Sequence, residues 1–265
     1  MVENEKQAAP KSFGAEYDIV RDYWNSHLHD ISVVTATPGS LDFFEQLNNY
    51  RFGKLHYLPE LVDYSGYQGK KVLEVGCGAG VDLVHFARGG ADVTGIDLAD
   101  VSINLARENF AHRNLSGEFQ VMNGEAMDFA DDSFDAVYCH TVLMYTPNIE
   151  KMIQEIHRVL KPGGLAIFQL FNRKSWLKAM SAVVQVEVEH VNAPNFALYS
   201  AQEFSAMLKP FSTVEIIPER FPYPTKIHSG LKAQLYNNVF VKSFNLIPKF
   251  IVKPLGWHLV SFARK

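Results

Sequence analysis

Apolar and polar residues follow two different periods along this chain, and the change between them predicts where helices are replaced by strands. From Glu16 to Leu28, and again from Leu41 to about Tyr57, apolar and aromatic residues recur at helical spacing. The intervening ATPGS interrupts this pattern and provides residues that favour a turn and a helix cap. We therefore expect at least two helices before the first strand.

A regular alternation of short apolar runs and amphipathic stretches begins with KVLEV at 71–75. The predicted strands are 71–75, 91–96, 119–122, 134–139 and 164–171. The predicted helices between them are 81–88, 101–112 and 149–160, with Asp100 as the expected cap of the second. This order of strands and helices predicts a parallel sheet with both faces covered.

The last third of the chain contains a predicted helix at 200–211, capped by Ser200, and predicted strands at 212–217 and 256–265. Two stretches, 173–200 and 218–256, do not fit the alternation. Connections this long are uncommon in a compact domain unless they are functional or disordered, and their aromatic content argues against disorder. We expect both to cover a substrate.

Composition narrows the class of protein. The 265 residues are 47% hydrophobic and 20% charged, as in ordinary globular proteins. A net charge of −4 leaves no overall electrostatic footprint for nucleic acid, so no such partner is expected. Two cysteines are too few for a disulfide framework. Without an apolar run of signal or spanning length, we expect a cytoplasmic protein.

A glycine-rich loop carries the strongest chemical signal. Glu74 to Gly80, with the sequence EVGCGAG, ends a predicted strand and opens a predicted helix. Glycines there permit close approach of the backbone to a ligand, and the helix N-terminus favours an anionic group. Asp97 ends the next strand, where a carboxylate can accept hydrogen bonds from both hydroxyls of a ribose. The pattern therefore predicts a ligand that contains adenosine.

Two other interpretations of this loop remain open. A dinucleotide fingerprint requires glycine at position 81, where this chain has Val81. The second alternative is a plain turn between a strand and a helix, which the position of Asp97 argues against.

Four sequence blocks resemble the class I methyltransferases, in particular the ubiquinone-biosynthesis-like bacterial branch that acts on small molecules. They are VLEVGCGAG (72–80), VTGIDLADVSINLAREN (93–109), NGEAMDFADDSFDAVYCHTVLMY (123–145) and EIHRVLKPGGLAIF (155–168). The resemblance implies a doubly wound α/β fold with seven strands in the order 3-2-1-4-5-7-6, the last antiparallel. It also implies S-adenosylmethionine as donor and S-adenosylhomocysteine as product, with no metal expected.

Residues 1–14 are rich in Glu, Lys, Gln, Ala and Pro and show no apolar periodicity, so we expect them to form a mobile tail. Together with the resemblance, this leaves 15–265 as a single methyltransferase domain. Within the domain, 15–65 would form an N-terminal helical cap and 70–172 the donor-binding core.

The same resemblance assigns residues to the methionyl end of the donor. Gly76, Gly78 and Gly80 would lie beside the methionyl part, and Glu74 would lie near its ammonium group.

At the other end of the donor, Asp97 would hold the ribose and Leu98 would pack on the adenine. Glu125 and the backbone of Ala126 would recognise the polar edge of the adenine. The alternative for Glu125 is a solvated acid in a loop.

His140 is the leading candidate for a general base. It follows the predicted strand 134–139, at the edge where open parallel sheets bind ligands, and an imidazole can titrate near neutral pH. The alternative is an orienting hydrogen bond without proton transfer. Tyr23 and Trp24 are candidates for closing over the donor, with ordinary packing of an aromatic pair on a helix as the alternative. His190 and His228 are candidates for contact with the acceptor.

Arg51 is a further candidate, as the cation that pairs with the methionyl carboxylate. The region 219–256 contains six basic residues and one acid, interleaved with aromatic residues. It would suit a lid over an apolar or anionic acceptor, or contact with a membrane surface. The alternative is a core-facing helix with solvated lysines.

The sequence thus predicts methylation of a small molecule at oxygen, nitrogen, carbon or sulfur. The rival functions are a non-catalytic module that binds S-adenosylmethionine and a dinucleotide-dependent oxidoreductase. The sequence predicts neither the acceptor nor the oligomeric state.

Overall fold

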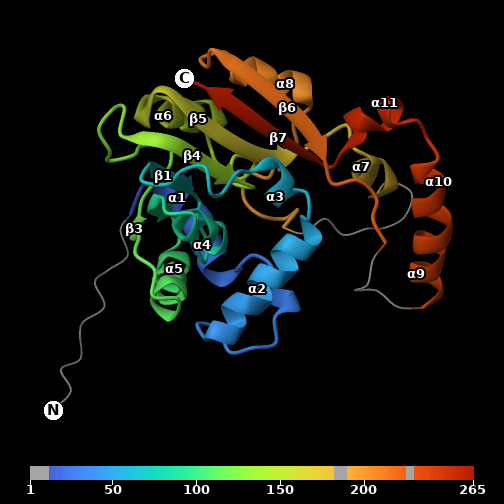
Figure 1. The fold of residues 1–265 in the computed structure, drawn as a ribbon, viewed down its shortest axis with the longest axis horizontal. Coiled ribbons are helices and arrows are strands. Elements are labelled where there is room, and N and C mark those ends of the chain that lie inside the picture. The colour runs from blue at the N-terminus through green and yellow to red at the C-terminus, as the bar shows by residue number, and fades with distance from the viewer. Residues whose placement is uncertain (1–11, 182–189, 225–229) are drawn as a thin grey trace.

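Seven strands of the chain form one sheet in a computed structural model that describes residues 12–181, 190–224 and 230–265 (Figure 1). The order β3-β2-β1-β4-β5-β7-β6 confirms the predicted arrangement. The strands are β1 (Lys71–Val75), β2 (Asp92–Asp97), β3 (Glu118–Val121), β4 (Phe134–His140), β5 (Leu160–Phe171), β6 (Thr213–Glu219) and β7 (His258–Arg264). Only β7 runs antiparallel to its neighbours, β5 and β6.

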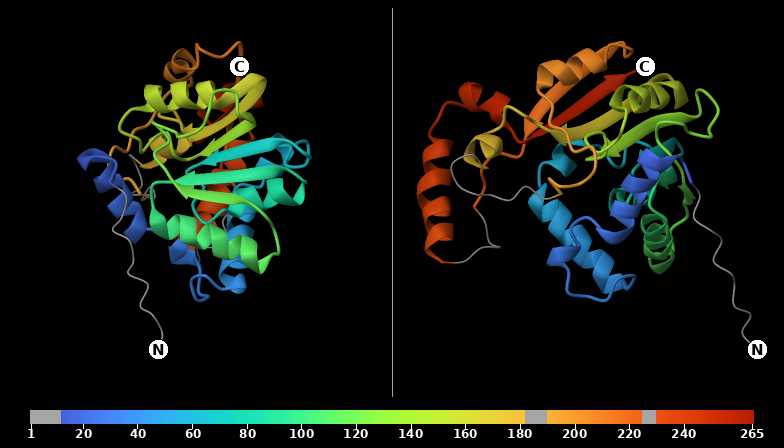
Figure 2. Two further views of the ribbon diagram at one scale, coloured as in Figure 1. Left: turned by 90° about the vertical axis from the view of Figure 1, so that its left-hand side faces the viewer. Right: turned by 180° about the vertical axis from the view of Figure 1, so that it is seen from behind.

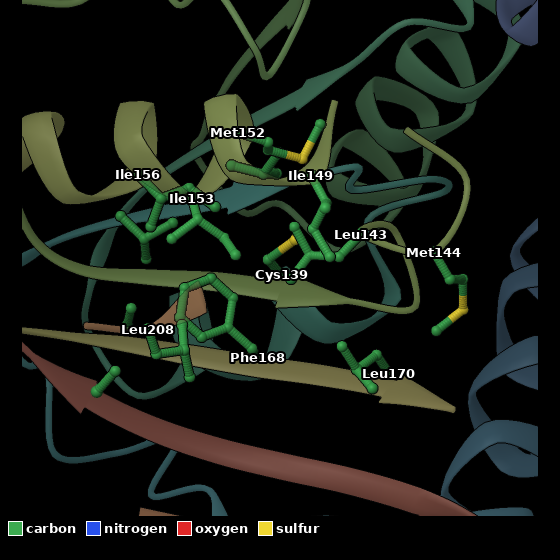
Figure 3. Packing of buried hydrophobic residues seen from close by; sticks show 14 of the residues in the cluster. Cys139, Leu143, Met144, Ile149, Met152, Ile153, Ile156, Phe168, Leu170 and Leu208 are labelled. Atoms are coloured by element: carbon green, nitrogen blue, oxygen red, sulfur yellow. The ribbon is translucent and has the colours of Figure 1, made fainter. Parts of the chain in front are cut away.

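Alternating side chains of the central strands supply two separate cores, because successive residues of a strand point to opposite faces. On one face the sheet packs against α4 (Val81–Arg88), α5 (Asp100–His112) and the short α3 (Leu58–Leu61). On the other face it packs against α6 (Ile149–Val159) and α8 (Ala201–Met207). Figure 3 shows Ile153 and Ile156 of α6 packing toward Phe168 of β5.

The predicted N-terminal helices are present as α1 (Ala15–Ser26) and α2 (Leu41–Lys54), with the short η1 (Ile31–Val33) between them. Ser40 caps α2 by accepting a hydrogen bond from Phe43 N. Phe43 and Phe44 are buried against Leu105 of α5. These contacts fix α2 beside the glycine loop.

The predicted cap of α5 is wrong. Asp100 is the first residue of the helix and Ala99 is the N-cap. The capping bond comes instead from α1, where Asn25 Oδ1 accepts a hydrogen bond from Val101 N (3.2 Å) and Asn25 Nδ2 donates to Asp100 (3.2 Å). A residue 76 positions away thus satisfies a free N–H of the helix.

The last part of the chain adds a helical segment at one end of the sheet (Figures 1 and 2). It consists of α7 (Trp176–Ser181), α9 (Leu231–Leu235), η2 (Tyr236–Phe240), α10 (Val241–Asn245), α11 (Lys249–Val252) and η3 (Lys253–Leu255). Trp176 contacts Phe240 and Phe244, with ring centroids 6.0 and 6.3 Å apart. Within the described residues, no helix combines the length and apolar character needed to cross a membrane.

Candidate active site

The loop between β1 and α4 has a backbone that requires glycine. Gly76 and Gly80 both have φ of +70°, a conformation that side chains with a Cβ rarely adopt. A Cβ at Gly76 would also lie 2.2 Å from a methyl carbon of Val142. Gly78 has φ of +51°, and a Cβ there would meet no atom within 4 Å, so its outer side faces open space.

Asp97 is tied to this loop. Its Oδ2 accepts a hydrogen bond from Gly78 N (3.0 Å) and its Oδ1 accepts one from Ala99 N (2.9 Å). The carboxylate is partly exposed, and each of its oxygens can still accept a further bond. Burial nevertheless raises the pKa of Asp97 above its ordinary value.

A cavity runs along the loop and under α1 and α2. Eight of the residues predicted from the sequence line it: Trp24, Arg51, Glu74, Gly76, Gly78, Asp97, Leu98 and His140. Gly80 is the N-cap of α4 and does not line the cavity. Tyr23 does not line it either, but its ring contacts the ring of Trp24. The structure therefore brings together residues from β1, β2, β4 and α1.

Two buried polar atoms in the cavity wall have no hydrogen-bond partner among the described residues: Glu74 Oε2 and Arg51 Nε. Burial, with the nearby Asp82 carboxylate, raises the pKa of Glu74 well above its ordinary value. Arg51 forms an ion pair with Asp82, so it is neither exposed nor solvated as an ordinary helix arginine would be. The wall thus offers an unused acceptor and an unused donor, which suit an ammonium and a carboxylate.

His140 is held by a network that leads to Asp82. Its Nδ1 lies 2.9 Å from the hydroxyl of Tyr138, and that hydroxyl lies 3.4 Å from Asp82 Oδ1. Because the phenol has one proton and the carboxylate only accepts, Tyr138 donates to Asp82 and accepts from His140. His140 therefore carries its proton on Nδ1, which leaves a lone pair on Nε2.

The environment of His140 favours its neutral form. Burial, together with the positive charge of Arg51, lowers the pKa of this imidazole well below its ordinary value. Its ring also lies near the ring of His258, with centroids 6.5 Å apart. An unprotonated imidazole in the cavity wall can accept a proton from a bound molecule.

A second buried network lies next to His140 and was not predicted. The Tyr57 hydroxyl is hydrogen-bonded to His258 Nδ1, and Arg220 Nη1 lies 3.1 Å from His258 Nε2. Arg220 only donates, so His258 carries its proton on Nδ1. No local sequence pattern indicates this contact, because Tyr57 and His258 are 201 residues apart.

Aromatic and imidazole rings cluster at the α1 side of the cavity. Trp24 contacts Tyr145 and His190, with centroids 5.0 and 4.8 Å apart. The Tyr23 hydroxyl lies 3.2 Å from His190 Nδ1, and the Tyr23 ring stacks on His27. His190 thus contacts Trp24, which lines the cavity, but does not itself line it.

Glu125 is fully buried, and its carboxylate is already used by three donors. These are the hydroxyls of Tyr17 and Thr146 and the backbone N–H of Asn148. Glu125 is therefore not the solvated loop acid of the alternative. Neither Glu125 nor Ala126 lines the cavity, although Gly124 does.

The two late additions contribute no described residue to the cavity wall. His228 lies outside the described residues. Among the residues that are described, no group of three or more histidine, cysteine or acidic side chains could hold a metal ion. Cys77 and Cys139 are both buried thiols.

Sequence reasoning missed Asp82, which joins Arg51, Tyr64 and Tyr138. Its place two residues after the glycine loop was the available signal, because an acid in a first helical turn that lines a ligand loop has few solvated neighbours.

Comparisons with known proteins agree with this geometry. Residues 73–168 match the family model described as a methyltransferase domain. A ubiquinone biosynthesis O-methyltransferase of Actinobacillus pleuropneumoniae is 33% identical over 189 residues, which cover 64% of this chain and 78% of that protein. The sterol 4-C-methyltransferase strm-1 of Caenorhabditis elegans is 29% identical over 197 residues, which cover 72% of this chain and 56% of that protein.

Among solved structures, the geranyl diphosphate C-methyltransferase of Streptomyces coelicolor has the same fold. It superposes with a TM-score of 0.58 at 16% identity, over 96% of this chain and 98% of that one. That structure contains Mg²⁺, geranyl diphosphate and S-adenosylhomocysteine. In sequence, the matched region spans little more than half the length of several curated relatives, between 52% and 59%.

Proposed function

Because this chain belongs to the class I S-adenosylmethionine-dependent methyltransferases, we propose that it transfers a methyl group from S-adenosylmethionine to a small-molecule acceptor. The observation that carries this proposal is the unpartnered, buried Glu74 Oε2 beside the glycine loop. An ammonium group of a ligand satisfies such an oxygen by donating a hydrogen bond to it, and its positive charge complements a carboxylate. We also propose that residues 15–265 act as a single methyltransferase domain.

The residues present fit this donor. Glu74 would accept from its ammonium, Arg51 would pair with its carboxylate and Asp97 would accept from its ribose hydroxyls. Leu98 would cover the adenine. When bound, S-adenosylmethionine supplies an electrophilic methyl group that a nucleophile displaces in line.

For Glu125 the contacts support a positioning role. Its carboxylate joins Tyr17 of α1 to Thr146 and Asn148, which precede α6. Recognition of adenine by Glu125 and the backbone of Ala126 remains a prediction.

His140 is the proposed base. With Nδ1–H directed at Tyr138, its Nε2 lone pair would take the acceptor's proton as the new bond to the methyl carbon forms. Trp24 and Tyr145 would exclude water from this part of the cavity. Tyr138 and Asp82 would fix the tautomer and so act as positioning residues.

We propose a largely apolar acceptor. The wall that remains beyond the glycine loop includes Trp24, Leu28 and Val142. The names of two relatives refer to ubiquinone biosynthesis and to sterols, chemistries that involve large apolar groups.

Calorimetry and a methyl-transfer screen together test the function. The purified chain should bind S-adenosylhomocysteine and should not bind NAD. Labelled methyl groups should then pass to at least one member of a panel of phenols, isoprenoids, sterols and amines. Binding of NAD alone would indicate the oxidoreductase, and binding of S-adenosylhomocysteine without transfer to any acceptor would indicate the non-catalytic module.

A further inference from the structure

The segment from Leu231 to Asn245 forms one continuous helix, through α9, η2 and α10, at the end of the molecule (Figures 1 and 2). Its inner side holds Phe240 and Phe244 against Trp176. A different side carries Leu231, Leu235 and Val239, which are 72%, 54% and 56% exposed. Spaced four residues apart, these three side chains form a single apolar stripe.

The turn that follows carries further exposed apolar side chains. Leu246 is 85% exposed and Phe250 is 79% exposed, and Ile247 and Ile251 are also exposed. Large apolar side chains that gather on one exposed surface indicate a contact with another apolar phase or partner. We call the seven residues of the stripe and the turn the α9–α11 surface.

Positive charge predominates in the two stretches at this end of the molecule, although Arg173 is paired with Glu203 and Glu219 lies near Lys253. Neither 172–181 nor 231–256 contains an acidic residue, whereas together they contain Arg173, Lys174, Lys178, Lys232, Lys242, Lys249 and Lys253. Lys178 of α7 and Lys242 and Lys253 of the later segment are exposed. This concentration of positive charge stands out because the whole chain has a net charge of −4.

We propose that the α9–α11 surface docks on an anionic lipid bilayer, with the apolar side chains in the interface and the lysines at the headgroups. Exposed aromatic and aliphatic groups flanked by lysines are the composition that binds such a surface. A twofold dimer through the same surface would bring like charges together. Closure over the cavity is not supported, because no described residue of the segment lines it.

Vesicle sedimentation tests the docking. The full chain should pellet with vesicles of phosphatidylcholine and phosphatidylglycerol (7:3), and at least tenfold less with phosphatidylcholine alone. Binding should weaken as salt is raised from 0.1 to 0.5 M, since surface charges are screened. Leu246→Glu/Phe250→Glu should lose binding at least tenfold, and Lys242→Glu/Lys253→Glu should lose it on anionic vesicles.

The matched control is Ile19→Glu, which places the same charge at a 60% exposed position of α1, outside this surface. It should bind vesicles as the parent does. Unchanged binding of Leu246→Glu/Phe250→Glu, or equal binding of the parent to neutral vesicles, would overturn the proposal. A parent dimer that these substitutions make monomeric, without vesicle binding, would assign the surface to a second copy instead. Binding of S-adenosylhomocysteine is measured in every variant, so failure of docking is distinguishable from failure of the proposed function.

Discussion

Among single residues, polar atoms of the cavity wall keep hydrogen-bonding capacity that a ligand can use. The Asp97 carboxylate accepts bonds from the protein and still has this capacity. Two backbone donors already hold its carboxylate in place, and each oxygen keeps the capacity to accept a further bond, as the proposed bonds to two ribose hydroxyls require.

Asp97→Ala should weaken binding of S-adenosylhomocysteine by about 2–4 kcal/mol, the range of a pair of hydrogen bonds to a charged group. Calorimetry measures this loss. Asp92→Ala is the control, because Asp92 is exposed at the opposite end of the same strand and should leave the affinity unchanged. If Asp97→Ala binds as tightly as the parent, the ribose assignment is wrong.

His140→Ala should lower kcat by roughly 100- to 10,000-fold, the usual contribution of a general base, with donor affinity almost unchanged. In the parent, a base whose pKa lies well below its ordinary value is unprotonated at neutral pH. The parent rate should therefore stay level through neutral pH and fall only in acid. If His140→Ala methylates an acceptor with the parent's kcat and pH profile, His140 is not the general base for that acceptor. The test uses an acceptor that must lose a proton, because a strong nucleophile needs no base.

At the scale of elements, α1 forms one wall of the cavity and is held there by few polar contacts. Tyr17 donates to Glu125 (2.7 Å) near the start of the helix, and Asn25 contacts α5 near its end. Burial and the Glu125 carboxylate raise the pKa of Tyr17 to about 12, so the phenol remains a donor at neutral pH.

Tyr17→Phe should loosen α1 by about 1 kcal/mol, because the hydroxyl makes a hydrogen bond to a charged group at a partly exposed position. Amides of α1 should then exchange roughly fivefold faster, and donor affinity should fall with them. Tyr50→Phe on α2, where the ring lies 5.0 Å from Lys54 Nζ, is the matched control. Unchanged exchange in α1 would show that this bond does not hold the helix.

At the scale of the whole molecule, the two buried histidines link stability to pH. Burial and Arg220 lower the pKa of His258 well below its ordinary value, as burial and Arg51 do for His140. In the unfolded chain an imidazole has a pKa of about 6.5. Below that pH the unfolded state takes up protons that the folded state does not, so stability decreases as pH falls.

His258→Gln should reduce this dependence on pH. Between pH 6.5 and 5.5 the free energy of unfolding of the parent should fall more steeply than that of the variant, by about 1 kcal/mol per pH unit. Urea denaturation at several pH values measures both slopes. Glu74 has a raised pKa and acts in the opposite direction, but it is present in both proteins and cancels in the comparison. Equal slopes would show that His258 takes up protons equally in the folded and unfolded states, so that folding does not lower its pKa.

The order of the elements and the donor loop could be predicted from the amino-acid sequence, because both depend on residues that are close together along the chain. The mostly apolar run of β1 and the helical spacing of α6 are local patterns, and the glycines at 76 and 80 follow from the backbone angles of one turn. The place of Asp97 at the end of the next strand is equally local. The family resemblance added the crossing order of the strands.

Only the tertiary structure decided which side chains meet across the fold. Arg51 reaches Asp82 from another helix, Tyr57 meets His258 across 201 residues, and Glu125 binds Tyr17 instead of solvent. Periodicity predicts which face of an element is buried, but not which other face it meets. A buried polar group requires a partner wherever that partner lies in the sequence, so these pairs follow from packing and not from local pattern.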